Sequence, residues 1–386
     1  MSATGAAAGA APSPDPSASQ LPKPASGHIA PLSAFWQQAA FTLGGIDFLQ
    51  IDVALAAMVF GDWAQFEKRL AQGLACATRA SVENLPASAS VVEQAAISFR
   101  YERDLISGAD ITAWLERGGF SAEGWMAYIT RSVLRQTWSD DLEDILDRYG
   151  PSPRQLQSAA LAEGVCSRLF DEFEQAFAGR AATAFTIDAA RFESRAVMSA
   201  SHADVAARLA RQHAHWLEGR AALDTQARLR VVLQIRDLYC AATETLVTDA
   251  ALRDVLEANH VEWVVIDTDT LSFADESAAR EALLCVNEDR LSLSDIAELS
   301  RHPLIRTHGF LDDVPSEHRH RLLAAEPGRV IGPLLVDGRY HVTTVTGRTV
   351  PTLDDPHVAR RARTTFLDHI AHRAAREHVS RRRVSS

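Results

Sequence analysis

The sequence predicts an α+β protein with a mostly helical N-terminal part, a small α/β domain after it, and a C-terminal helix. Apolar residues recur at spacings of three and four over most of residues 31–258, as in helices with one buried face. At Val261 the pattern changes to β-rich runs, and the Asp-Gly pair at 337–338 is a hairpin signal between two of them. The Asp-Asp-Pro at 354–356 is typical of a helix start, and a polar helical run follows to about His378.

The composition indicates an ordinary globular protein without a general surface for nucleic acids. The chain has 386 residues, of which 47% are hydrophobic and 23% are charged, enough for two or more domains. Its net charge of −11 disfavours nucleic acid as a partner, because phosphate binding requires a basic face. The arginine run at 381–383 is strongly basic, and we interpret it as a solvated tail.

The N-terminal residues and the cysteines predict a cytoplasmic protein. Residues 1–30 are rich in Ala, Ser, Pro and Gly and lack a basic start before an apolar run, which predicts a disordered tail and not a secretory signal. The apolar stretch at 53–60 is too short to cross a bilayer, so we expect no membrane partner. The cysteines form no CxxC pair and lie in helical runs, which predicts reduced, buried thiols. They are Cys76, Cys166, Cys240 and Cys285.

The predicted helical part, residues 31–258, precedes the β-rich segment. Over 31–79 the pattern is mostly helical, and we interpret Gly-Gly at 44–45 as a break in it. After a proline-rich turn a longer helix is predicted from about 155 to 178, and another long helical run covers about 225–258.

Two His-x-His pairs, at 213–215 and 318–320, do not predict a metal site. In the first pair the two imidazoles lie on different helix faces, whereas a metal ion needs convergent ligands. The second pair lies on a predicted surface helix. We therefore expect these histidines to be mostly solvated, and we expect no metal or cofactor.

The small α/β domain is predicted over residues 259–351. The run VEWVVID opens it as a strand at Val261, and a turn is expected around Asp269. Helices are expected over 277–286 and 292–299, and VIGPLLV and YHVTTV are the final strands. Residues 352–386 then form the C-terminal helix and the basic tail.

Four stretches of this segment carry a family resemblance: VEWVVID, LSLSDIAELS, HGFLDDVP and PGRVIGPLLVDGRYHVTTV. They resemble the parvulin-type peptidyl-prolyl isomerases, which include the PpiC, SurA and PrsA kinds. The N-terminal helices, especially YERDLISGADITAWLERGGFS, are similar to the helical part of such chaperone-isomerases. They also resemble parvulin-like proteins associated with peptide maturation systems.

The resemblance implies a pocket that binds peptides at a proline. Rotation about a peptide bond must cross roughly 18–20 kcal/mol, and a pocket that holds the twisted amide better than the planar forms lowers this barrier without a cofactor. In parvulins the last strand carries a histidine after an aromatic residue. By this comparison His341 and His302 are the candidate catalytic residues, and Phe310, Leu311, Val314 and Tyr340 are the candidate substrate-binding residues.

Three departures from the family pattern leave two functions open. The family's first strand normally carries a histidine, whereas here Trp263 takes that place or His260 sits at the strand's edge, depending on register. The segment at 300–302, Ser-Arg-His, stands where the family has Ser-Asp-Cys or a similar run, and the places of apolar pocket residues fall near Asp313 and Glu317. The chain is therefore predicted to be an isomerase or chaperone for peptide clients, in peptide natural-product maturation. The alternative is a catalytically inactive peptide-binding accessory protein.

Overall fold

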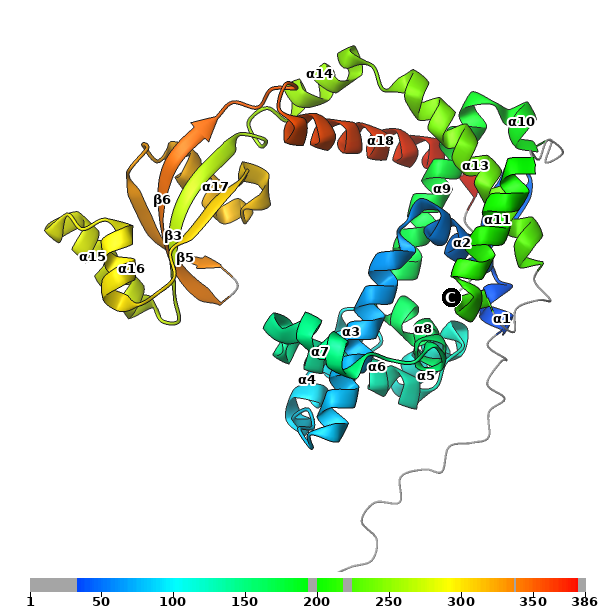
Figure 1. The fold of residues 1–386 in the computed structure, drawn as a ribbon, viewed down its shortest axis with the longest axis horizontal. Helices are drawn as coiled ribbons and strands as arrows, with labels where there is room; N and C mark the ends of the chain where they lie inside the picture. Colours follow the sequence, from blue (N-terminus) through cyan, green and yellow to red (C-terminus); the bar gives the residue numbers. More distant parts are fainter. Residues whose placement is uncertain (1–32, 194–199, 218–223, 337, 381–386) are drawn as a thin grey trace, which may run out of the picture. The chain divides into compact units, whose positions relative to one another are not determined.

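The computed structural model describes residues 33–193, 200–217, 224–336 and 338–380, and it shows a mostly helical α+β protein with two small antiparallel sheets (Figure 1). The predicted α+β class is confirmed at this coarse level. The chain divides into two compact units, Met1–Gln38 with Phe66–Arg168 and Ala39–Gln65 with Leu169–Ser386. The predicted tail at 1–30 and the arginines at 381–383 lie outside the described residues.

The described part of the first unit is helical. Its helices are α1 (Ser33–Trp36), most of α3 (Trp63–Val82), α4 (Ala89–Tyr101), α5 (Gly108–Gly118), α6 (Ala122–Thr137), the 3₁₀ turn η1 (Ser139–Asp141), α7 (Leu142–Tyr149) and α8 (Pro153–Cys166). Ser107, Ser121 and Ser152 each accept a backbone N–H bond at the start of a helix. These caps define the boundaries of the helices because the first N–H groups of a helix have no partner within it.

A buried ion cluster joins three helices of this unit. Glu163 of α8 is only 3% exposed, and its carboxylate lies 3.2 Å from Arg69 Nε of α3 and 3.6 Å from Arg131 Nη2 of α6. Each of these charges is costly to remove from water unless it is paired. Packing of the three helices therefore depends on Glu163.

The second unit begins with a hairpin where the sequence analysis predicted helix. Strands β1 (Ala39–Leu43) and β2 (Ile46–Leu49) pair antiparallel, and β7 (Val379–Ser380) pairs with β1. Between β1 and β2, Gly44 and Gly45 have φ values of +56° and +74°, which glycine adopts without steric cost. The two glycines form a hairpin turn, so the helical prediction for this stretch is wrong.

The other helices of the second unit differ from the prediction in where they divide. They are α2 (Gln50–Phe60), α9 (Leu169–Ile187), α10 (Ala189–Glu193), α11 (Ala200–Gln212), α12 (Ala214–Leu217), α13 (Thr225–Leu246), α14 (Asp249–Ala258) and α18 (Pro356–His378). The single helix predicted over 155–178 is wrong, because α8 ends at Cys166 and Arg168 has a φ of +64°. The predicted run at 225–258 is also two helices, since Thr248 caps α14.

Two general predictions are also tested by the structure. Cys76 and Cys166 are buried, but Cys240 is exposed, so the prediction of burial is wrong for Cys240. Burial raises the pKa of the Cys166 thiol, which keeps it protonated. None of the helices in the described ranges is long and apolar enough to cross a membrane.

A four-stranded antiparallel sheet forms the small α/β part of the second unit. Its strand order is β4-β3-β6-β5, and the strands are β3 (Val265–Phe273), β4 (Ile305–Phe310), β5 (Val330–Val336) and β6 (Arg339–Thr349). The predicted turn near Asp269 is wrong, because β3 continues through this residue. Strand β4 was not predicted, since it is an exposed edge strand without alternating apolar residues. Val336 pairs with Arg339 at the β5–β6 hairpin, of which residue 337 is outside the described residues.

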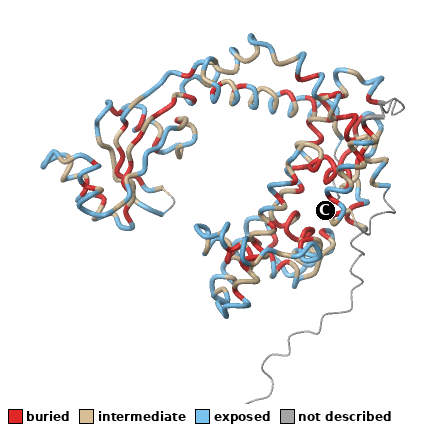
Figure 2. Tube along the Cα trace, in the orientation of Figure 1, coloured by how far each residue is buried: buried red, intermediate tan, exposed pale blue. Residues whose placement is uncertain are grey.

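The two faces of this sheet carry different layers (Figures 1 and 2). Helices α15 (Glu276–Asp289) and α16 (Leu293–Ser300) pack on one face, against Leu271, Phe273 and Val342. The 3₁₀ turn η3 (Leu311–Asp313) and α17 (Ser316–Ala324) pack on the other, around Ile266 and Val345. Alternate residues of each strand serve opposite layers. Strand β3 is mostly buried, and β6 is buried in its middle, at Val342, Thr343 and Val345.

Candidate functional site

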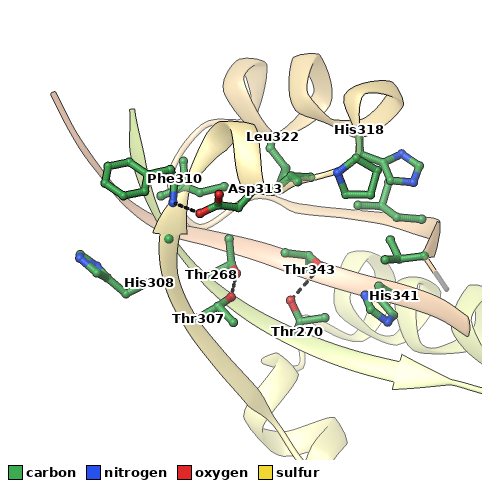
Figure 3. A pocket seen from close by; sticks show the side chains of 16 residues that line it. Thr268, Thr270, Thr307, His308, Phe310, Asp313, His318, Leu322, His341 and Thr343 are labelled. Atoms are coloured by element: carbon green, nitrogen blue, oxygen red, sulfur yellow. Dashed lines mark hydrogen bonds between the residues drawn. The ribbon is translucent and has the colours of Figure 1, made fainter. Parts of the chain in front are cut away.

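A cavity of about 300 Å³ lies on the sheet face that η3 and α17 cover (Figure 3). All four strands contribute to its lining, together with η3 and α17. Its volume is at the lower end of the range for small-ligand pockets. The cavity is therefore suited to one ring or side chain of a larger ligand.

Four threonines form the polar floor of the cavity. Thr268 and Thr270 of β3 lie opposite Thr307 of β4 and Thr343 of β6. The hydroxyl oxygens are 2.6 Å apart in the Thr268–Thr307 pair and 3.0 Å apart in the Thr270–Thr343 pair (Figure 3). Each hydroxyl has one donor and two acceptor sites, so a threonine pair that shares one bond retains capacity for a peptide group.

The wall of the cavity is apolar. Ile266 and Leu322 lie at one side, Leu334 and Val336 come from β5, and Val314 follows the η3 turn. Apolar walls above a few convergent polar groups are typical of ligand sites. An uncharged ring that carries an amide on one side fits a cavity with apolar walls and a polar floor.

His341 lies in the cavity lining on β6, opposite Leu334 of β5. The backbone of β5 approaches it closely at Gly332, which has a φ of +152°. A Cβ atom at Gly332 would lie 2.9 Å from the carbonyl oxygen of His341, closer than a normal contact. The strand position of His341 therefore depends on a glycine here.

Gly332→Ala should lower the free energy of unfolding of the second unit by about 2–3 kcal/mol, because it adds a backbone clash to an unfavourable φ. Urea unfolding of the full chain measures this change. Gly328→Ala is the matched control, since Gly328 also has a positive φ of +86° but no atom within 4 Å of its Cβ position. Equal losses for the two variants would contradict the close approach at His341.

His318 is a second histidine in the cavity lining, and the sequence analysis predicted it to be solvated. That prediction is wrong: His318 is 9% exposed, and its Nε2 lies 3.0 Å from the carbonyl oxygen of Leu335. Because a carbonyl only accepts, Nε2 carries a proton. His320 is exposed as predicted. Leu322 lies four residues after His318, on the same helix face. This apolar neighbour was the sequence signal that His318 is buried.

The structure brings three of the six predicted site residues to the cavity. His341, Val314 and Phe310 are in the lining, although the Phe310 ring points away from His341 (Figure 3). Phe310 therefore contributes mainly through its backbone.

The other three predicted site residues lie elsewhere. Leu311 is 3% exposed and belongs to the core beneath the cavity. Tyr340 packs on the opposite face of the sheet, in the cluster that includes Phe273. The ring of His302 lies 5.1 Å from that of Phe273, and its Nδ1 is 3.1 Å from the carbonyl oxygen of Ser300. His302 is thus directed to the α15–α16 layer.

Neither Trp263 nor His260, the two places considered for the first-strand histidine of the family pattern, lies within β3. Trp263 precedes β3 and packs against Val358 and Ala362 of α18, and the Nδ1 of His260 bonds the carbonyl oxygen of Glu257 at 3.0 Å. Neither lines the cavity. The side chains of β3 that do so are Ile266, Thr268 and Thr270, and Thr270 lies opposite Thr343 of β6.

The ionisable side chains His308 and Asp313 at the edge of the cavity each contact another protein group. His308 Nδ1 lies 2.6 Å from Asp267 Oδ1, and the imidazole points away from the threonine floor (Figure 3). Asp313 Oδ2 accepts the Phe310 N–H at 3.3 Å, and its other oxygen lies 3.1 Å from Arg361 Nη2. The lining thus favours an uncharged part of a ligand.

The described residues contain no group of three or more His, Cys, Asp or Glu side chains placed to hold a metal ion. No protein-family model and no curated protein sequence matches this chain.

Proposed function

We propose that the cavity binds proline-containing segments of peptide clients, and that the chain acts as a parvulin-like peptidyl-prolyl isomerase or chaperone. The observation that carries this proposal is the combination of an apolar wall, a threonine floor and His341 in one cavity of about 300 Å³. The wall accommodates the proline ring, and the hydroxyls bond the neighbouring carbonyl groups. A cytoplasmic role in peptide natural-product maturation belongs to the same proposal.

The chemistry required of the site is noncovalent. As the X-Pro amide twists, it loses the resonance that makes up most of the barrier. Hydrogen bonds that are stronger to the twisted amide than to the planar forms accelerate rotation. The threonine floor and the Nε2-protonated His318 are fixed before a peptide enters, so no large rearrangement of these groups is required on binding.

The alternative proposal is a peptide-binding accessory protein without catalysis. It is favoured by the lack of a histidine in β3, whose side chains in the cavity lining are Ile266, Thr268 and Thr270. A pocket that binds the planar and twisted amides equally well gives affinity but no acceleration.

Titration of the full chain with a set of X-Pro peptides, together with an isomerisation assay on the same peptides, tests both proposals. Peptides with alanine in place of proline are the control. Proline-dependent binding with faster isomerisation supports the isomerase, and proline-dependent binding alone supports the accessory protein. Equal binding of the proline and alanine peptides, or no binding of either, would contradict the proposed site.

A further inference from the structure

The C-terminal helix α18 contacts the turn that closes one end of the cavity. Arg361 Nη2 of α18 lies 2.7 Å from Asp312 Oδ2 and 3.1 Å from Asp313 Oδ1. The Arg361 guanidinium also lies over the Phe310 ring, with its carbon 4.4 Å from the ring centroid. One side chain outside the segment that resembles parvulins thus contacts Phe310, Asp312 and Asp313, of which Phe310 and Asp313 are in the cavity lining.

These contacts fix the position of the η3 turn. Asp313 and Val314 line the cavity, and Asp313 also accepts the Phe310 N–H. From the other side, Arg319 of α17 donates to the carbonyl oxygens of Asp312 and Val314 at 2.7 Å each. The turn is therefore held between two arginines, of which only Arg361 bonds the carboxylates.

The charges at this contact depend on one another. Partial burial lowers the pKa of Arg361, but the bonds to Asp312 and Asp313 outweigh it, and the net shift is upward. Asp312 and Asp313 are adjacent carboxylates, which repel one another without a counter-ion. Removal of the guanidinium would therefore free the turn to move.

We infer that Arg361 is a positioning residue for the cavity, which makes α18 part of the peptide-binding site. Its role is to hold the wall formed by Asp313 and Val314 in place before a peptide arrives, and a wall ordered in advance costs less entropy on binding. This inference rests on the proposed peptide-binding function. It adds that the site requires a residue beyond the small α/β part.

Peptide titration of full-length variants tests this role. Arg361→Gln should bind proline peptides about five- to tenfold more weakly, because two charge-assisted bonds to the turn are lost. Arg361→Lys should be intermediate, since an ammonium keeps the charge but not the planar guanidinium that lies over the Phe310 ring. Arg360→Gln is the matched control, with the same charge change at an exposed neighbouring position, and should bind as the wild type does.

A double-mutant cycle separates positioning from general stability. If Arg361 acts through the turn, Asp313→Asn should weaken binding in the wild-type chain but add little in the Arg361→Gln background. Hydrogen exchange at residues 310–314 should be faster in free Arg361→Gln than in free Arg360→Gln. If Arg361→Gln does not fold, Arg361→Lys gives the same comparisons.

The outcomes distinguish this inference from the proposed function. Wild-type affinity for proline peptides together with unchanged hydrogen exchange in Arg361→Gln would overturn this inference but not the proposed function. Additive losses in the cycle, or equal losses in Arg360→Gln, would also overturn it. Absence of proline-dependent binding by the wild-type chain would instead refute the proposed function. Hydrogen exchange does not require a bound peptide, so unchanged exchange in Arg361→Gln would in that case show separately that Arg361 does not hold the turn.

Discussion

Thr307→Trp should weaken the binding of proline-containing peptides by about tenfold or more, which corresponds to about 1.4 kcal/mol or more. Thr307 is the exposed member of the threonine floor, on edge strand β4, where it pairs with Thr268. An indole at this position would occupy space that a proline ring needs. Because the position is exposed and at a sheet edge, folding should tolerate the change. Titration with the best-binding X-Pro peptide measures the loss.

Two further variants show whether the loss comes from a blocked cavity. Arg306→Trp places the same ring at the neighbouring position of β4, whose side chain faces the other side of the sheet beside Asp269. It should leave peptide binding unchanged. Thr307→Val removes the hydroxyl without filling the cavity and should have a smaller effect than Thr307→Trp. Wild-type affinity in Thr307→Trp would mean that peptides bind elsewhere.

Glu163→Ala should lower the free energy of unfolding of the first unit by about 3–5 kcal/mol, the range for breaking a buried ion pair from one side. Without the carboxylate, Arg69 and Arg131 lose their shared counter-ion, and Arg131 is only 7% exposed. The adjacent Arg135 already has a pKa lowered by burial and by the charge of Arg69. This region therefore has little capacity for another unpaired cation.

Urea unfolding combined with hydrogen exchange of α3, α6 and α8 measures this loss and assigns it to the first unit. The matched control is Glu143→Ala, which removes a carboxylate of α7 that pairs with Lys68 of α3 at 3.0 Å. Both partners of that pair are exposed, so the unfolding midpoint should not change measurably. A small effect of Glu163→Ala, similar to that of Glu143→Ala, would contradict the importance assigned to the buried cluster.

The parts of the fold that the sequence predicted are those with local signals. Helices α15 and α16 lie where helices were predicted over 277–286 and 292–299, and α18 begins directly after Asp355, as expected from the Asp-Pro pair. The last two strands are present on either side of the Asp-Gly pair. Gly44 and Gly45 show the limit of such signals, because a Gly-Gly pair is compatible with both a helix break and a hairpin turn.

The candidate site was predictable only in part. His341 and Val314 were identified by resemblance, and both lie in the cavity lining. His302 and Tyr340 were identified in the same way but face the other layer of the sheet. Tyr340 and His341 are adjacent on β6, and adjacent residues of a strand face opposite sides of the sheet. His302 lies in the connection between α16 and β4, and the sequence carries no periodic signal for its direction.

The sequence by itself determined an α+β chain with a helical majority, a hairpin before a C-terminal helix, and a histidine on the last strand. The tertiary structure alone decided which side chains meet at the cavity. The hydroxyl pair of Thr268 and Thr307 joins residues 39 positions apart, and the bond from Arg361 to Asp312 spans 49 positions. Such contacts result from strand register and from the docking of α18, and neither leaves a periodic pattern in the local sequence.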